Sequence, residues 1–97
     1  MAYWGSWEDY PKTYRKGEEV AIIDGRYYTK HAVDHFTPSY LDSCDGRGIS
    51  PTYIEEAIRY GSIVERRSNS VTYQNGSLLV AVDPDDGTVI TVMDRHK

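Results

Sequence analysis

The sequence predicts an α+β domain in which an N-terminal hairpin and two short helices pack on one face of a four-stranded antiparallel sheet. Residues 29–61 contain two segments with the caps and apolar spacing of helices. Residues 62–93 contain four short segments of strand character, separated by turn-forming residues. Because these strands follow one another through short turns, we expect an antiparallel meander with its second face open.

Residues 1–18 are expected to form an irregular arm. The segment is rich in aromatic residues, contains Gly5, Pro11 and Gly17, and shows neither a helical nor a strand period. Its aromatic side chains either cover an edge of the core or form a docking surface. Residues 19–97 are predicted to be a single domain, since 97 residues support one modest core.

A hairpin and a first helix are predicted to follow the arm. Asp24 and Gly25 separate two apolar runs, and this residue pair tolerates the positive φ angles of a type I′ turn. Thr29 stands at the N-cap position of a helix in which Ala32, Val33 and Phe36 share one face. Proline at position 38 is expected to end this helix.

The stretch "SPTYIEEAIRYG" predicts the second helix. Serine stands at its N-cap, proline at its first position and Gly61 just past its end. The predicted inner face is formed by Tyr53, Ile54, Ala57 and Ile58. Its charged side chains, Glu55, Glu56 and Arg59, are expected to face water.

Four strands are predicted after Gly61, in "SIVERR", "SVTYQ", "SLLVAVD" and "TVITVM". Asn75-Gly76 is a strong hairpin signal, and "PDDG" is a second turn. The run "LLVAV" is apolar at every position, so we expect it to be the central strand, covered on both faces.

Composition and charge exclude several classes of function. The net charge of −4 argues against a protein that binds polyanions through a large basic excess. Cys44 is the only cysteine, so no internal disulfide is expected and the sequence fits a reducing compartment. No membrane span and no secretory signal are expected, because no apolar run approaches about 18 residues and the N-terminus lacks a basic-then-apolar layout.

Three stretches together resemble one known family. "YTKHAVDHF", "GRGISPTYIEEAI" and "SVTYQNGSLLVAVDPDDGTVITV" resemble the small RNase toxin domains at the C-termini of bacterial polymorphic and contact-dependent toxins, in the barnase, EndoU, colicin and RelE (BECR) superfamily. The resemblance covers about residues 19–93 and departs from the usual pattern at Phe36, where methionine is typical. It implies a metal-independent endoribonuclease that acts on RNA, tRNA included, in a competing bacterium. It also implies delivery as part of a larger toxin, no cofactor, and neutralisation by an immunity protein.

The resemblance also implies a set of site residues. It points to His31, Arg47, Thr72 or Tyr73, and Thr91. We expect the catalytic residues to be His31, Arg47, Tyr73 and Thr91, and the substrate-binding residues to be Thr72 together with the cations Lys30 and Arg67. Histidine can act as general acid or base near neutral pH, and a guanidinium offers a planar fork to phosphate oxygens. A threonine hydroxyl can donate to phosphate, and a phenol can stack a base or donate a proton. We expect His31 and Arg47 to lie close enough to share one phosphate.

Each of these residues also has a purely structural interpretation. His31 and His35 are four positions apart, so both can simply lie on the surface of one helix. A zinc site is not expected, because zinc needs a third ligand and neither Cys44 nor His96 has a ligand-like spacing. Arg47 can instead pair with a neighbouring aspartate. Two other classes of function therefore stay open: a non-catalytic protein-interaction module and an immunity-type inhibitor.

Overall fold

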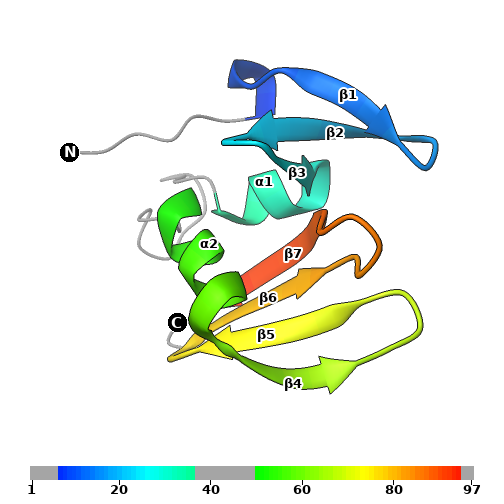
Figure 1. The fold of residues 1–97 in the computed structure, drawn as a ribbon. Helices are drawn as coiled ribbons and strands as arrows, with labels where there is room; N and C mark the ends of the chain where they lie inside the picture. Colours follow the sequence, from blue (N-terminus) through cyan, green and yellow to red (C-terminus); the bar gives the residue numbers. More distant parts are fainter. Residues whose placement is uncertain (1–6, 37–49, 95–97) are drawn as a thin grey trace.

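The fold is a single twisted sheet of seven strands with two helices on it, in a computed structural model that describes residues 7–36 and 50–94 (Figure 1). A 3-10 helix, Trp7–Asp9, comes first. The strands are β1 (Lys12–Arg15), β2 (Glu18–Ile23), β3 (Arg26–Thr29), β4 (Ser62–Arg66), β5 (Val71–Asn75), β6 (Leu78–Val82) and β7 (Val89–Asp94). The helices are α1 (Lys30–Phe36) and α2 (Pro51–Tyr60), so the α+β class stands.

The predicted four-stranded sheet is wrong, because the N-terminal strands join it. The strand order is β1-β2-β3-β7-β6-β5-β4, and only β3 and β7 run parallel, through the pair Tyr28 and Val89. The predicted hairpin is β2 and β3, and it is part of the sheet rather than a separate unit. Strand β1 lies within the segment expected to be an irregular arm and pairs antiparallel with β2. The central strand is therefore β7, not "LLVAV", which forms β6.

Local sequence signals explain where most elements begin and end. Asp24 and Gly25 have φ angles of 50° and 81°, as a type I′ turn between β2 and β3 requires. The Oγ1 atom of Thr29 accepts the backbone N–H of Ala32 at 3.1 Å and so caps α1. In α2, the Ser50 hydroxyl accepts the N–H of Thr52 at 3.2 Å and proline occupies the first position.

The core lies where α2 packs on β5 and β6 and where α1 packs along β7, so the two helices do not share one face of the sheet as the sequence predicted. Ala32 and Val33 of α1, Ile54 and Ala57 of α2, and the inward side chains of β2, β3, β5, β6 and β7 form one buried cluster. The prediction for α2 was wrong at Tyr53, whose side chain is 61% exposed. Trp7 and Tyr10 pack against the cluster, so these two aromatic residues cover the core.

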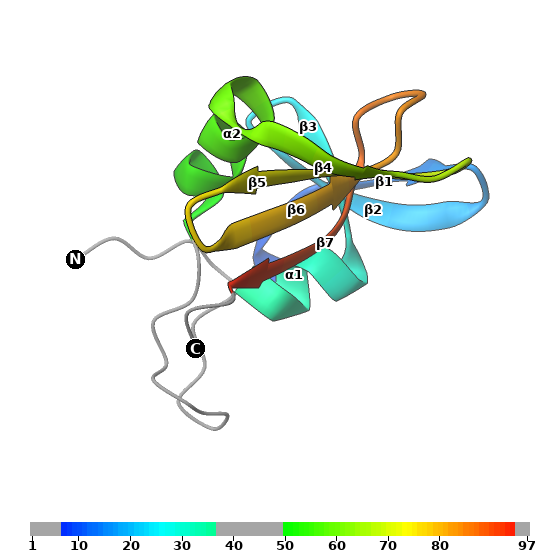
Figure 2. The same cartoon turned by 90° about the horizontal axis from the view of Figure 1, so that it is seen from below.

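The other face of β4 to β6 has no described helix over it, and α1 lies beside β7 (Figure 2). Strand alternation and register place Glu65, Thr72, Ala81 and Thr91 in one row across this face. A second row is formed by Ser62, Gln74, Leu79 and Met93. Strand β6 is therefore buried on one face and only half-buried on the other, not covered on both.

No helix in the described part of the chain is long and apolar enough to cross a membrane.

Candidate functional site: a pocket beside His31

Helix α1 presents His31 at the surface, one residue after its start. Thr29 fixes this start to the sheet, because its hydroxyl donates to the carbonyl oxygen of Ile90 at 2.8 Å while accepting the N–H of Ala32. Thr29 is 7% exposed, so both hydrogen bonds are shielded from water. The position of His31 relative to β7 is therefore set by a buried side chain.

His31 and His35 stack on each other at the surface of α1. Their ring centroids are 4.1 Å apart and their planes are tilted by 39°. The Nδ1 atom of His35 lies 3.2 Å from the carbonyl oxygen of Val92, so the His35 ring is held against β7 when Nδ1 carries the proton. The two histidines thus form one paired surface feature, with His35 as its anchored member.

A pocket of about 400 Å³ opens beside His31. Its wall includes the hydroxyl-bearing Thr29 and Thr88, the apolar Val20 and Ile90, and two cations, Arg15 and Lys16. Glu18, Asn69, Asp83 and Asp86 complete it. The pocket lies where the N-terminal strands β1 to β3 join the C-terminal strands β4 to β7, so it depends on the pairing of β3 with β7.

Ion pairs connect the two turns at the mouth of this pocket. Arg15 ends β1 and Lys16 begins the β1–β2 turn, and the β6–β7 turn carries three aspartates. Arg15 Nε lies 3.0 Å from Asp86 Oδ2. The Lys16 ammonium lies 2.7 Å from Asp83 and 2.9 Å from Asp85.

Hydrogen bonds to these carboxylates favour their charged forms. The Lys16 side chain is the main cause that lowers the pKa of Asp83 below its ordinary value. The Thr88 hydroxyl, 2.7 Å from Asp86 Oδ1, is the main cause that lowers the pKa of Asp86, and Arg15 adds to this effect. Both aspartates therefore stay ionised beside the pocket at neutral pH.

Among the described residues, none of the other site residues expected from the sequence lines the pocket beside His31. Thr72 and Thr91 lie on the uncovered face of the sheet and do not line the His31 pocket. Tyr73 lies on the opposite face, where it packs against the core. Arg47 lies outside the described residues, so its expected proximity to His31 stays a prediction.

The other two residues expected to bind substrate, Lys30 and Arg67, form ion pairs outside the pocket. Lys30 pairs with Asp34 on α1 at 2.9 Å. Arg67 pairs with Glu65 at 2.7 Å, next to the β4–β5 turn. Neither side chain lines the His31 pocket.

Sequence reasoning missed the pocket's cations, Arg15 and Lys16, because they lie in a segment expected to be irregular. Lysine or arginine before a glycine in a turn is a common surface pattern, so the residues alone carried no functional signal. The aspartates of "DPDDG" were identified only as turn formers. The pairing of the two turns is visible only once β3 and β7 are known to be neighbours.

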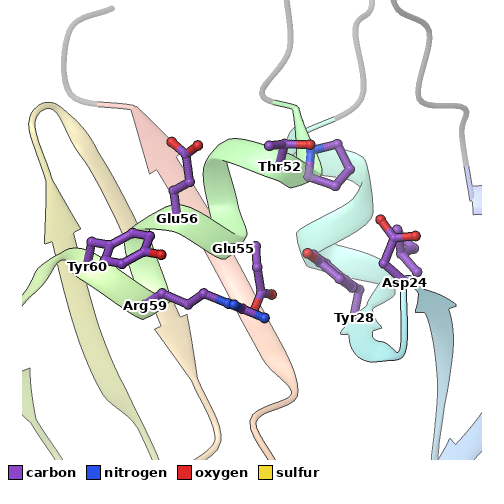
Figure 3. Close-up of a pocket in the computed structure, with 9 residues that line it drawn as sticks. Asp24, Tyr28, Thr52, Glu55, Glu56, Arg59 and Tyr60 are labelled. Atoms are coloured by element: carbon purple, nitrogen blue, oxygen red, sulfur yellow. The ribbon is translucent and has the colours of Figure 1, made fainter.

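A second pocket, of about 360 Å³, lies between α2 and the β2–β3 turn. Asp24 and Tyr28 lie on one side, and Glu55, Glu56, Arg59 and Tyr60 of α2 lie on the other (Figure 3). Two of its charged groups serve the fold, because Glu55 accepts hydrogen bonds from both Arg26 and Arg59. The pocket beside His31 is the better candidate site because a histidine lines it, whereas none of the described residues that line the second pocket is a histidine.

Among residues 7–36 and 50–94, no three histidine, cysteine, aspartate or glutamate side chains are grouped to hold a metal ion. In the mouth of the His31 pocket, the place between two aspartates is taken by the Lys16 ammonium.

One comparison with known proteins gives a match. Residues 28–94 match a protein-family model described as Domain of unknown function (DUF4258). The matched range begins in β3 and ends with β7, so it includes α1, α2 and both strands that meet in the parallel pair. No curated protein and no solved structure matches the chain.

Proposed function

The chain belongs to the DUF4258 family of domains of unknown function, and within it we propose that this protein is a metal-independent endoribonuclease that works in the His31 pocket. The observation that carries the proposal is the placement of an exposed histidine at the wall of a pocket that also holds two cations and two threonine hydroxyls. These are the side-chain types that RNA cleavage without a metal requires.

The reaction needs three events. The ribose 2′-hydroxyl loses a proton, negative charge develops on the phosphorane, and the 5′-oxygen gains a proton as it leaves. His31 takes the proton from the 2′-hydroxyl, since imidazole exchanges protons near neutral pH. The cationic side of the pocket stabilises the phosphorane, and the 5′-oxygen is protonated by the imidazolium or by water.

The same proposal includes a biological role. The domain acts as the toxic part of a larger bacterial protein, cleaves RNA such as tRNA in the cytoplasm of a competing cell, and is neutralised by a cognate immunity protein. The motifs around His31 and in "GRGIS" support this role through their resemblance to BECR toxin domains. A net charge of −4 requires that RNA be held by a local group of cations rather than by overall attraction.

A non-catalytic protein-interaction module is the second candidate. Large apolar side chains are exposed at Tyr14, Tyr53, Tyr60, Ile63, Val64 and Met93. Tyr60, Ile63 and Val64 follow the chain from the end of α2 into the edge strand β4, and such exposed apolar groups favour a protein partner.

RNA cleavage in EDTA separates the two candidates. The purified chain is incubated with total RNA, and we expect discrete cleavage products that do not depend on divalent metal. His31→Gln should slow cleavage about 10²- to 10⁴-fold while the protein remains folded. Asp34→Asn is the matched control, because Asp34 is also exposed on α1 but does not line the pocket.

Intact RNA with the parent chain would favour the interaction module. Equal cleavage by the parent and by the His31 variant would remove His31 from the reaction. In bacteria, the same variant should lose growth inhibition at an unchanged level of folded protein.

A further inference from the structure

Arg15 and Lys16, the two cations at the pocket mouth, differ in how many carboxylates they contact. The Lys16 ammonium contacts two carboxylates, Asp83 and Asp85. Arg15 contacts Asp86 through Nε alone, at 3.0 Å. Within residues 7–36 and 50–94, no hydrogen bond uses its two terminal Nη nitrogens.

The Arg15 guanidinium is held in a defined orientation. Its Cζ atom lies 4.9 Å from the centroid of the Tyr27 ring, within the range of a cation–π contact. Its carboxylate partner is fixed in turn, because Asp86 Oδ1 accepts hydrogen bonds from the Thr88 hydroxyl at 2.7 Å and the Thr88 N–H at 3.0 Å. The Tyr27 ring lies on one face of the guanidinium, and Asp86 accepts the hydrogen bond from Nε. The two Nη nitrogens are therefore the part of the Arg15 side chain that can bind a ligand.

We infer that Arg15 is a phosphate-binding residue of the His31 pocket and holds a phosphate group of a single-stranded nucleic acid through its Nη nitrogens. The inference rests on the proposed function for the choice of ligand. Guanidinium groups bind phosphate oxygens in a planar, two-pronged manner, and among the described residues that line the pocket only Arg15 offers such a fork. Asp86 orients the guanidinium, and the side chain remains 42% exposed for a ligand.

Binding is measured with a short oligodeoxynucleotide, because DNA lacks the 2′-hydroxyl and cannot be cleaved by the proposed reaction. The parent chain, Arg15→Gln and Arg59→Gln are titrated with the oligonucleotide at several salt concentrations. Arg59 is the matched control, since it is also an exposed, ion-paired arginine but lies on α2, outside the pocket. We expect Arg15→Gln to weaken binding about fivefold to tenfold and to reduce the slope of log K against log salt by about 0.7, as loss of one contact to a single strand predicts.

Asp86→Asn tests whether the effect of Arg15→Gln is only structural. This variant breaks the same ion pair but keeps the guanidinium, so it should retain the salt slope of the parent. Equal loss of binding and of salt slope in both variants would overturn the inference, as would equal binding by Arg15→Gln and Arg59→Gln, or no binding by the parent chain at millimolar oligonucleotide.

This experiment is separate from the test of RNA cleavage. Binding that depends on Arg15 in a protein that leaves RNA intact would support the phosphate site and remove the proposed activity. Cleavage of RNA by a protein whose Arg15→Gln variant binds the oligonucleotide as the parent does would keep the activity and remove Arg15 from the site.

Discussion

Arg26 and Glu55 form a two-pronged ion pair that ties β3 to α2. Arg26 Nε donates to one carboxylate oxygen of Glu55 at 2.7 Å, and its Nη2 nitrogen donates to the other at 3.0 Å. The remaining nitrogen of Arg26 donates to the carbonyl oxygen of Gly87 at 3.0 Å, so one side chain joins three segments of the chain. The side chains of Arg26 and Glu55 are only 23% and 31% exposed, which limits competition from water.

We expect Glu55→Gln to lower the free energy of unfolding by about 1–3 kcal/mol, because it leaves a partly buried guanidinium without its charged partner. Urea denaturation at pH 7 measures this change. Glu56→Gln is the control, since Glu56 is the exposed neighbour on the same helix and its loss should change stability by less than about 0.5 kcal/mol. Equal effects of the two substitutions would show that the ion pair adds nothing to stability.

The same pair makes stability depend on pH. The hydrogen bond from Arg26 is the main cause that lowers the pKa of Glu55 below its ordinary value of about 4.5. A carboxyl group with a lowered pKa in the folded state contributes stability that is present above pH 4.5 and is lost as the pH falls through the folded value. Unfolding midpoints in urea, measured from pH 6 down to pH 3, should therefore fall less steeply for Glu55→Gln than for the parent. Parallel curves for the two proteins would contradict this assignment.

The sequence predicted individual elements better than their assembly. Turn and cap signals are local, so Asp24-Gly25, Thr29 and Ser50 marked boundaries that the structure confirms. The seven-stranded sheet depends instead on the parallel pairing of β3 with β7, between Tyr28 and Val89. No local pattern specifies which strands become neighbours over such a distance in the chain, so the hairpin was expected to stand apart from the sheet.

The charged residues, both in the fold and at the candidate site, show the same limit. Glu55 has the spacing of a solvent-facing helix residue, and its partner Arg26 lies 29 positions earlier in the chain. Arg15, at the end of β1, and Asp86, in the β6–β7 turn, are 71 positions apart, and no local pattern connects them. His31 is a candidate because it lies in a short motif, whereas the composition of the pocket beside it depends on tertiary contacts.

Thr29 offers a test of how α1 is held to the sheet. Thr29→Val keeps the β-branched shape but leaves the carbonyl of Ile90 and the N–H of Ala32 without their hydroxyl partner. We expect a loss of about 1–3 kcal/mol in the free energy of unfolding, from the cap and the buried hydrogen bond together. Thr29→Ser retains the hydroxyl and should lose much less. A serine variant as unstable as the valine variant would mean that packing of the methyl group, not the hydroxyl, holds the helix.

Substitution of Thr91 tests which surface of the protein carries the proposed reaction. It pairs with Ala81 on the uncovered face of the sheet, in the same row as Thr72, and does not line the His31 pocket. Thr91→Val removes only the hydroxyl and keeps a shape that strands favour, so stability should change by less than about 0.5 kcal/mol. We also expect RNA cleavage to stay close to the parent rate, because His31 and the cations of its pocket are unchanged.

Thr88→Val is the informative comparison for Thr91→Val. Thr88 lines the pocket, and its hydroxyl donates to the carboxylate that holds Arg15. Its loss should therefore slow cleavage and also lower the melting temperature, since the side chain is 6% exposed and its carboxylate partner would lose a hydrogen bond. Melting temperature and cleavage rate are measured side by side for both variants. If Thr91→Val melts like the parent and yet cleaves RNA far more slowly, the reaction takes place on the uncovered face of the sheet, and the His31 pocket is not its site.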